Sequence, residues 1–218
     1  MPASHRHIRI GLIVEDKHSD AYRVLTQKIF PERVRGYPIR KNKTIPASPR
    51  LRSWIEQVRD KYDFVFVLVD ADTPLHRRSP TYFTDLRRIC DEAGAALLIV
   101  KIELESWLLA DVDSIARWKK SSQSLRPYPD TTHSPQDPKS EIVSLINRLN
   151  PGRQRRRTRT YNPQWTAEIA QALSLNEETR RRNKSLKCFY DLVRGCGGQH
   201  GQAYFDAYPH QAHCNTVD

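Results

Sequence analysis

The chain has 218 residues, of which 38% are apolar and 28% charged, and 36 lysines and arginines against 25 aspartates and glutamates give a net charge of +11. This length suits one sizeable domain or two small ones, and no apolar run reaches the roughly 18 residues of a membrane span. The basic balance favours a polyanionic partner, most often nucleic acid, although an arginine-rich composition from a GC-rich genome gives the same balance.

The N-terminal stretch "MPASHRHIRI" lacks the apolar segment of a secretion signal, so we expect a cytoplasmic protein. The four cysteines form no CxxC pair, and free thiols are the simplest expectation for them in that compartment.

Apolar runs alternate with amphipathic helical patterns through the first 105 residues. We predict strands at residues 8–14, 36–40, 63–70 and 95–103, and helices at 19–30, 48–62 and 79–94. Ser48 and Ser79 are expected helix N-caps, each followed by a proline, and Gly94 is expected to end the third helix. This order predicts an α/β fold with a parallel sheet covered by helices on both faces.

Beyond residue 105 the pattern becomes helical and basic. We expect one or two short helices at 105–118, a long loop at 119–137, and helices at 137–150, 164–175 and 177–195. The predicted organisation is an α/β core at 1–112, a helical basic extension packed on it at 113–194, and a flexible tail at 195–218. Three histidines and two cysteines near this tail match no zinc-ligand spacing that favours a metal site over a flexible segment.

Acidic residues follow three of the predicted strands. In a parallel sheet all strands end at one edge, where ligands of open α/β sheets bind. Such carboxylates repel one another unless a cation lies between them, and sets of oxygen ligands suit Mg²⁺ or Mn²⁺. The acids in question are Glu15 and Asp16, Asp70 and Asp72, and Glu103 and Glu105.

Three of these stretches resemble the Toprim domains of topoisomerases, primases and OLD-type nucleases. The resemblance lies in the Glu of "LIVEDKHSD", the DxD of "VFVLVDADT" and the later acid of "KIELESWLLAD". Together with "DPK" at 137–139 and "RNKSLKCFYDLV" at 182–193, the order and spacing are similar to a bacterial Toprim-like family related to RloB-type proteins. The resemblance covers about residues 8–194, and Asp16 stands where the family usually has glycine.

The resemblance implies a metal-dependent nuclease that acts with an ABC-type or AAA-type ATPase as a toxin-like effector of phage defence. It implies metal ligation of Mg²⁺ or Mn²⁺ by Glu15, Asp70, Asp72 and Glu105. Glu15 is further implied in proton transfer, and Lys139 in contact with the scissile phosphate. Asp20 is a weaker candidate, for which an ordinary acid in the first turn of a helix is the simpler interpretation.

Two other interpretations remain open. A Toprim-shaped module without catalytic activity would dock on an ATPase and take up no metal. A response-regulator receiver is a third interpretation, in which "LIVED" supplies the acidic pair, Asp70 accepts the phosphoryl group and Lys101 is the lysine at a strand end. The interval from Glu15 to Asp70 is longer than a receiver uses.

Two groups of cations are candidates for binding nucleic acid. One is a loop with five arginines, and the other is predicted to lie on a single later helix. Aromatic residues nearby, Tyr161, Trp165 and Phe189, either stack on bases or belong to the core, and the core is favoured. The cations are Arg153, Arg155, Arg156, Arg157 and Arg159 in the loop, and Arg180, Arg181, Arg182, Lys184 and Lys187 on the helix.

Overall fold

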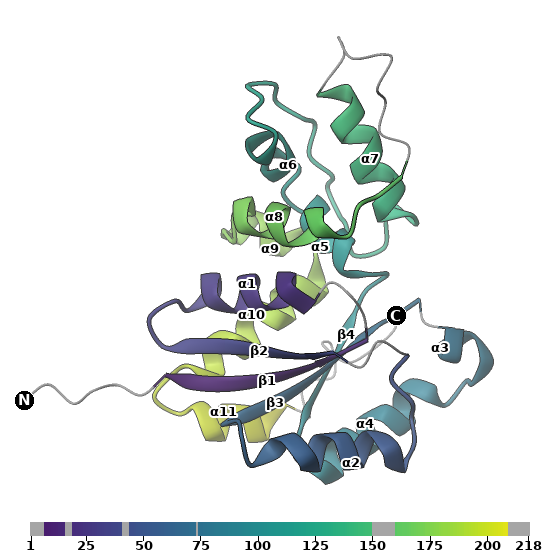
Figure 1. The fold of residues 1–218 in the computed structure, drawn as a ribbon, viewed down its shortest axis with the longest axis vertical. Coiled ribbons are helices and arrows are strands. Elements are labelled where there is room, and N and C mark those ends of the chain that lie inside the picture. Colours follow the sequence, from purple (N-terminus) through teal and green to yellow (C-terminus); the bar gives the residue numbers. More distant parts are fainter. Residues whose placement is uncertain (1–6, 16–18, 41–43, 73, 150–159, 209–218) are drawn as a thin grey trace, which may run out of the picture.

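The computed structural model describes residues 7–15, 19–40, 44–72, 74–149 and 160–208. Its centre is a four-stranded parallel sheet with the strand order β2-β1-β3-β4. The strands are β1 (Ile8–Val14), β2 (Val34–Arg40), β3 (Phe64–Asp70) and β4 (Ala96–Val100). The predicted α/β class and parallel sheet are therefore confirmed, whereas β4 ends three residues before the predicted boundary, so that Glu103 follows the strand (Figure 1).

The connections between strands are helical, as the alternating pattern predicted. They are α1 (Ser19–Ile29), α2 (Pro49–Arg59), the short α3 (Pro74–Arg78) and α4 (Tyr82–Ala93). Ser48 is the N-cap of α2 with Pro49 in its first turn, as predicted, but α4 begins later, with Thr81 as its N-cap. Gly94 ends α4 with a φ of 71°, in the left-handed region that glycine adopts without steric cost.

Each face of the sheet has its own apolar cluster. Leu12, Phe66 and Leu98 point to the face covered by α1 and by the later helix α10 (Lys184–Cys196), which we call the α1 face. Ile13 and Val67 point to the other face, covered by α2 and α4, which we call the α2 face. The alternation follows from the two-residue period of a strand. Helices cover both faces of the sheet (Figure 1), which explains why these strands are apolar on both sides.

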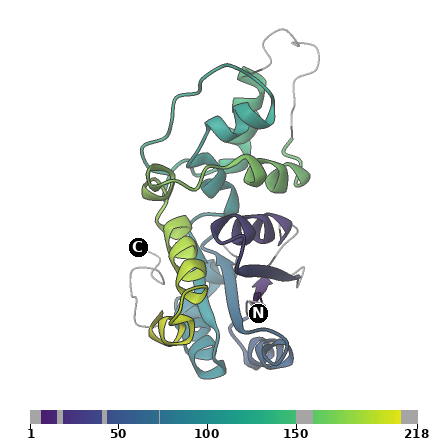
Figure 2. The ribbon, with the colours of Figure 1, turned by 90° about the vertical axis from the view of Figure 1, so that its left-hand side faces the viewer.

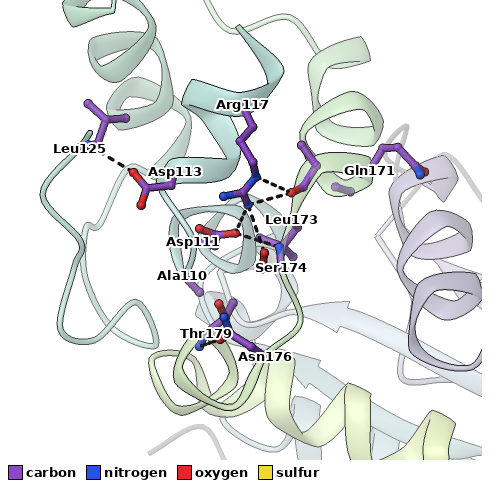
Figure 3. Close-up of polar contacts among 12 residues, drawn as sticks. Ala110, Asp111, Asp113, Arg117, Leu125, Gln171, Leu173, Ser174, Asn176 and Thr179 are labelled. Atoms are coloured by element: carbon purple, nitrogen blue, oxygen red, sulfur yellow. Dashed lines mark hydrogen bonds and ion pairs between the residues drawn. The ribbon is translucent and has the colours of Figure 1, made fainter. Parts of the chain in front are cut away.

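Five helices form a lobe beside the sheet, which we call the helical lobe. It contains α5 (Leu104–Leu109), α6 (Asp113–Trp118), α7 (Pro138–Arg148), α8 (Gln164–Ala172) and α9 (Glu177–Arg181), and it lies above α1 in Figure 1. Within it, Arg117 donates to the carboxylate of Asp111 and to the carbonyl of Ala172, and Asp111 accepts from the backbone N–H of Ser174 (Figure 3). These bonds tie α6 to the C-terminal end of α8.

The last helices return from the lobe to the sheet. The single helix predicted at 177–195 is wrong, because Asn183 interrupts it and caps α10. The prediction of a flexible tail from residue 195 is also wrong as far as residue 208, because α10 continues to Cys196 and α11 (Gly201–Ala207) follows (Figure 2). The Phe205 ring lies 4.9 Å from that of Phe64 on β3. Residues 209–218 lie outside the described residues.

The cysteines only partly match the prediction of free thiols. Cys90 and Cys196 are free and buried, whereas Cys188 is disulfide-bonded, which corrects the prediction for that residue. Among the described residues, none of the helices has the length and apolar character needed to cross a bilayer.

Candidate functional site

The carboxylate that follows β1 is turned toward the α2 face. Glu15 accepts a hydrogen bond from the backbone N–H of Ile45 at 2.8 Å. Ile45 is itself buried, and its carbonyl accepts a hydrogen bond from the hydroxyl of Tyr82 at 2.7 Å. Glu15 therefore holds the segment that leads into α2, and Asp16 lies outside the described residues.

Asp70, at the end of β3, belongs to the opposite face. The register pairs Val14 of β1 with Leu68 of β3. The next residue of β1, Glu15, is therefore opposite Val69, and Asp70 is one position further along. Because successive side chains of a strand alternate between faces, this offset of one residue sends the two acids to different sides of the sheet. Glu15 and Asp70, predicted to share one ion, leave the edge in different directions.

Asp72 lies in the turn after β3 and has a cation of its own. It forms an ion pair with Arg77 of α3, in which both side chains are more than half exposed. Its backbone N–H points to the carbonyl of Ile102, in the turn after β4, at 3.4 Å. The two acids of the DxD motif therefore have different partners in this arrangement.

The ammonium of Lys139, in the first turn of α7, lies among carboxylates on the α1 face. Its Nζ lies 2.5 Å from Glu103 and 3.8 Å from Glu105. Burial lowers the pKa of Lys139, but the charges of Glu105, Glu103 and Asp70 together outweigh that effect and raise the pKa above its ordinary 10.5. Lys139 is thus a cation throughout the physiological pH range.

The sequence around Lys139 explains its position. Asp137 is the N-cap of α7, and its carboxylate accepts the backbone N–H of Ser140 at 2.9 Å. Pro138 occupies the first helical position, where its missing N–H costs nothing. The "DPKS" stretch therefore begins the helix at a defined residue and directs Lys139 toward the carboxylates of α5.

Glu105 is the most enclosed of these acids. It is only 1% exposed. Burial, followed by the negative charge of Glu105, raises the pKa of the Tyr161 hydroxyl, which lies 2.7 Å from the hydroxyl of Thr166. Tyr161 therefore stays protonated beside the carboxylate. We call Asp70, Glu103, Glu105 and Lys139 the acidic site.

The predicted metal-ligand set is not assembled in the described part of the chain. There, no group of three or more histidine, cysteine, aspartate or glutamate side chains is arranged to hold a metal ion. Glu15 is engaged by Ile45 and Asp72 by Arg77, and the acidic site already contains an ammonium. A divalent ion does not fit these residues as they are arranged, so we derive no reaction step through one.

The predicted nucleic-acid contacts are only partly described. The five arginines at 153–159 lie outside the described residues. Arg182 is mainly structural, because it donates to the carbonyl of Ala110 at 3.2 Å and pairs with Glu178 at 3.0 Å. Arg181 also pairs with Glu178, but 77% of its side chain is exposed. Lys184 is exposed at the start of α10, so it does not share one helix with the two arginines.

The other cations of this group have partners of their own. Lys187 pairs with Asp191 at 2.6 Å, and Arg180 lies over the ring of Tyr190 at 3.9 Å. Phe189 is buried beside Trp107, which agrees with the favoured interpretation of a core residue.

Sequence reasoning did not find the residues that enclose the acidic site. The sequence marks Tyr161 only as a stacking or core residue, and Thr166 belongs to no recognisable motif. Thr166 lies in α8 and Tyr161 shortly before it, and Tyr161 comes near Glu105 only because this part of the chain packs against α5, a contact that local sequence does not encode. Asn183 was also missed, although an asparagine just before an apolar helical pattern is an N-cap signal.

Comparisons with protein-family models, with curated proteins and with solved structures found no match to this chain.

Proposed function

We propose that the protein is a Toprim-like phosphodiesterase that acts on nucleic acid at the carboxyl edge of its sheet. The observation that carries the proposal is the acidic site, in which the ammonium of Lys139 lies 2.5 Å from Glu103 and 3.8 Å from Glu105. The charge of Asp70 also raises the pKa of Lys139. The position agrees with the general location of ligand sites in open parallel sheets. The roles of a toxin-like effector in phage defence and of a cytoplasmic ATPase partner rest on the sequence resemblance alone.

The exposure of each side chain in the acidic site indicates the role that it has in the proposed reaction. Glu103 is 20% exposed, whereas Glu105 is 1% exposed, so Glu103 is the carboxylate that takes a proton from the water attacking phosphorus. As the P–O bond to the leaving group breaks, Glu103 returns that proton to the departing oxygen. Lys139 contacts a phosphate oxygen, and Glu105 keeps Lys139 charged. Because the carboxylates outnumber the lysine, a phosphate approaching the site also needs external cations, for which Arg181, Lys184 and the arginine loop are the candidates.

The test is cleavage of labelled single-stranded and double-stranded RNA and DNA by purified protein, with Mg²⁺, with Mn²⁺ and with a chelator. We expect cleavage by the wild type and a loss of at least about a hundredfold in Asp70→Ala and in Lys139→Met, the usual scale for losing one electrostatic group of an active site. Asp85→Ala, an exposed acid on α4, is the matched control and should cut as the wild type does. Equal cleavage by Asp70→Ala, with an unchanged circular dichroism spectrum, would remove Asp70 from the reaction.

A second candidate is a Toprim-shaped module without catalytic activity that docks on an ATPase. The observation that favours it is the internal pairing of the predicted ligands, because an acidic site that already contains Lys139 needs no ion to remain folded. Cleavage separates the two candidates. Cleavage by the wild type that Lys139→Met abolishes supports the enzyme, and binding to an ATPase without any cleavage by the wild type supports the module.

A further inference from the structure

A cavity of about 590 Å³ opens at the carboxyl edge, and its lining includes Ala71 and Ile102, which are adjacent in sequence to Asp70 and Glu103 of the acidic site. Its walls come from the turn after β3 and α3, from the turn after β4, and from the loop before α7. They include Asp72, Arg77, Lys101, Ile102, Thr132 and His133. The volume lies within the roughly 300–1,000 Å³ of pockets that bind small molecules.

The wall formed by Ile102 is strained. Ile102 has a φ of 62°, in the left-handed region that a β-branched residue rarely adopts. Its carbonyl is held by the N–H of Asp72, and the neighbouring N–H of Ala71 donates to the carbonyl of Val100 at 2.8 Å. Strain of this kind persists where the surroundings enforce it, and such places are concentrated at ligand sites.

A buried network of hydrogen bonds from the start of α10 fixes the residues that form the cavity walls. The Ser185 hydroxyl accepts hydrogen bonds from the N–H of Lys101 at 3.2 Å and from the indole of Trp107 at 2.7 Å. Asn183 donates to the carbonyl of Thr131 at 3.0 Å, next to the wall residue Thr132. Lys101 and the loop are thus fixed by the same end of α10, which is how binding sites keep their shape before a ligand arrives.

The cavity suits an anion. Lys101 is only 7% exposed and lies in the wall, and Arg77 and His133 contribute further donors. Among the described residues of the wall, Asp72 is the only carboxylate, and it is balanced by Arg77. That pair is exposed and solvent screens it, so it opens easily and Arg77 is available to a ligand that offers two oxygen atoms.

We propose that this cavity binds a nucleoside monophosphate unit, with its phosphate on Lys101 and Arg77 and its sugar and base against Ile102. The choice of a nucleotide over other phosphorylated molecules rests on the proposed function, because the cavity adjoins the acidic site. The unit is either a free nucleotide or the phosphorylated end of a strand, since both present the same chemistry. In this arrangement Asp72 weakens anion binding, because it pairs with Arg77 and adds a negative charge to the wall. The sequence predicted a different role for Asp72, that of a metal ligand.

The experiment is isothermal titration in the presence of a chelator, so that neither cleavage nor a metal contributes. The probes are 5′-monophosphates, the matching nucleosides, and a short oligonucleotide with and without a 5′-phosphate. We expect saturable binding of the phosphorylated probes only, weakened about tenfold or more in Lys101→Met and several-fold in Arg77→Gln. Asp72→Asn should bind more tightly than the wild type, because it releases Arg77 and removes a negative charge from the wall.

Arg88→Gln is the matched control, because Arg88 is an exposed arginine of α4 that also pairs with acids. It should bind as the wild type does. Should Lys101→Met fail to fold, Arg77→Gln and Asp72→Asn carry the test, because both side chains are exposed and remote from the core. Binding by both variants equal to the wild type, or equally tight binding of nucleosides without phosphate, overturns the inference. Nucleotide binding without any cleavage overturns the proposed function alone, and cleavage without nucleotide binding overturns the cavity assignment alone.

Discussion

At the scale of single residues, Lys139 is the cation that offsets the negative charges of the acidic site at the carboxyl edge of the sheet. It stands between carboxylates that would otherwise repel one another, and its pKa is raised by them. The sequence allowed the acids to be found, because each follows an apolar strand, and it placed Lys139 near the phosphate. It did not show that the lysine pairs with Glu103 and Glu105, because that contact spans 36 residues and depends on how α7 packs against α5.

The first prediction concerns Lys139→Met, which leaves Asp70, Glu103 and Glu105 without this cation. We expect a loss of about 1–3 kcal/mol in the free energy of unfolding at pH 7, measured with urea. Because the folded-state pKa of Lys139 lies above its ordinary 10.5, the stabilisation is fully present below pH 10.5 and is lost as the pH rises through the folded-state value. The difference between wild type and variant should therefore shrink in that alkaline range, and a difference that stays constant there would contradict the assignment.

At the scale of elements, Asn183 caps the N-terminus of α10 and also connects that helix to the loop before α7. Its carbonyl oxygen accepts the N–H of Leu186 at 3.0 Å, and its amide donates to Thr131. The strand β1 and the start of α2 were predictable, because apolar period and capping residues are local signals. The break at Asn183 was missed, because the flanking residues favour helix strongly and the polar contacts that stabilise the break come from distant parts of the chain.

The second prediction compares two caps. Asn183→Ala should cost about 2–4 kcal/mol in the free energy of unfolding, since it removes a cap and leaves buried groups without partners. Asn176→Ala, the exposed cap of α9, should cost only about 1 kcal/mol, because it loses a single bond to the N–H of Thr179. Urea unfolding measures both, and equal costs would mean that the Asn183 network adds nothing beyond capping.

At the scale of the whole molecule, Lys28 links α1, which covers one face of the sheet, to the helical lobe. Its ammonium donates to the carbonyls of Gln171 and Leu173 at 2.5 and 2.6 Å, where α8 ends. A cation at this position compensates the partial negative charge of a helix C-terminus. The sequence predicted both parts but not this connection, because no local pattern of α1 specifies the element that covers it.

The third prediction follows from that contact. Lys28→Met should speed amide hydrogen exchange at the end of α8 and leave exchange in β3 unchanged, because only the lobe contact is lost. Lys187→Met removes an exposed lysine that pairs within its own helix, and it should leave exchange in α8 as in the wild type. Faster exchange throughout the sheet in Lys28→Met would show instead that the contact supports global stability.

The hydrogen bond between Lys101 and Ser185 spans 84 residues of chain. During translation, all four strands leave the ribosome well before α10 is made, so a nascent chain carries the sheet without the support behind Lys101. We therefore expect a nascent chain to lack the nucleotide binding proposed for the cavity until Ser185 has been made. The same order explains why residues 1–112 expressed alone would lack a finished cavity.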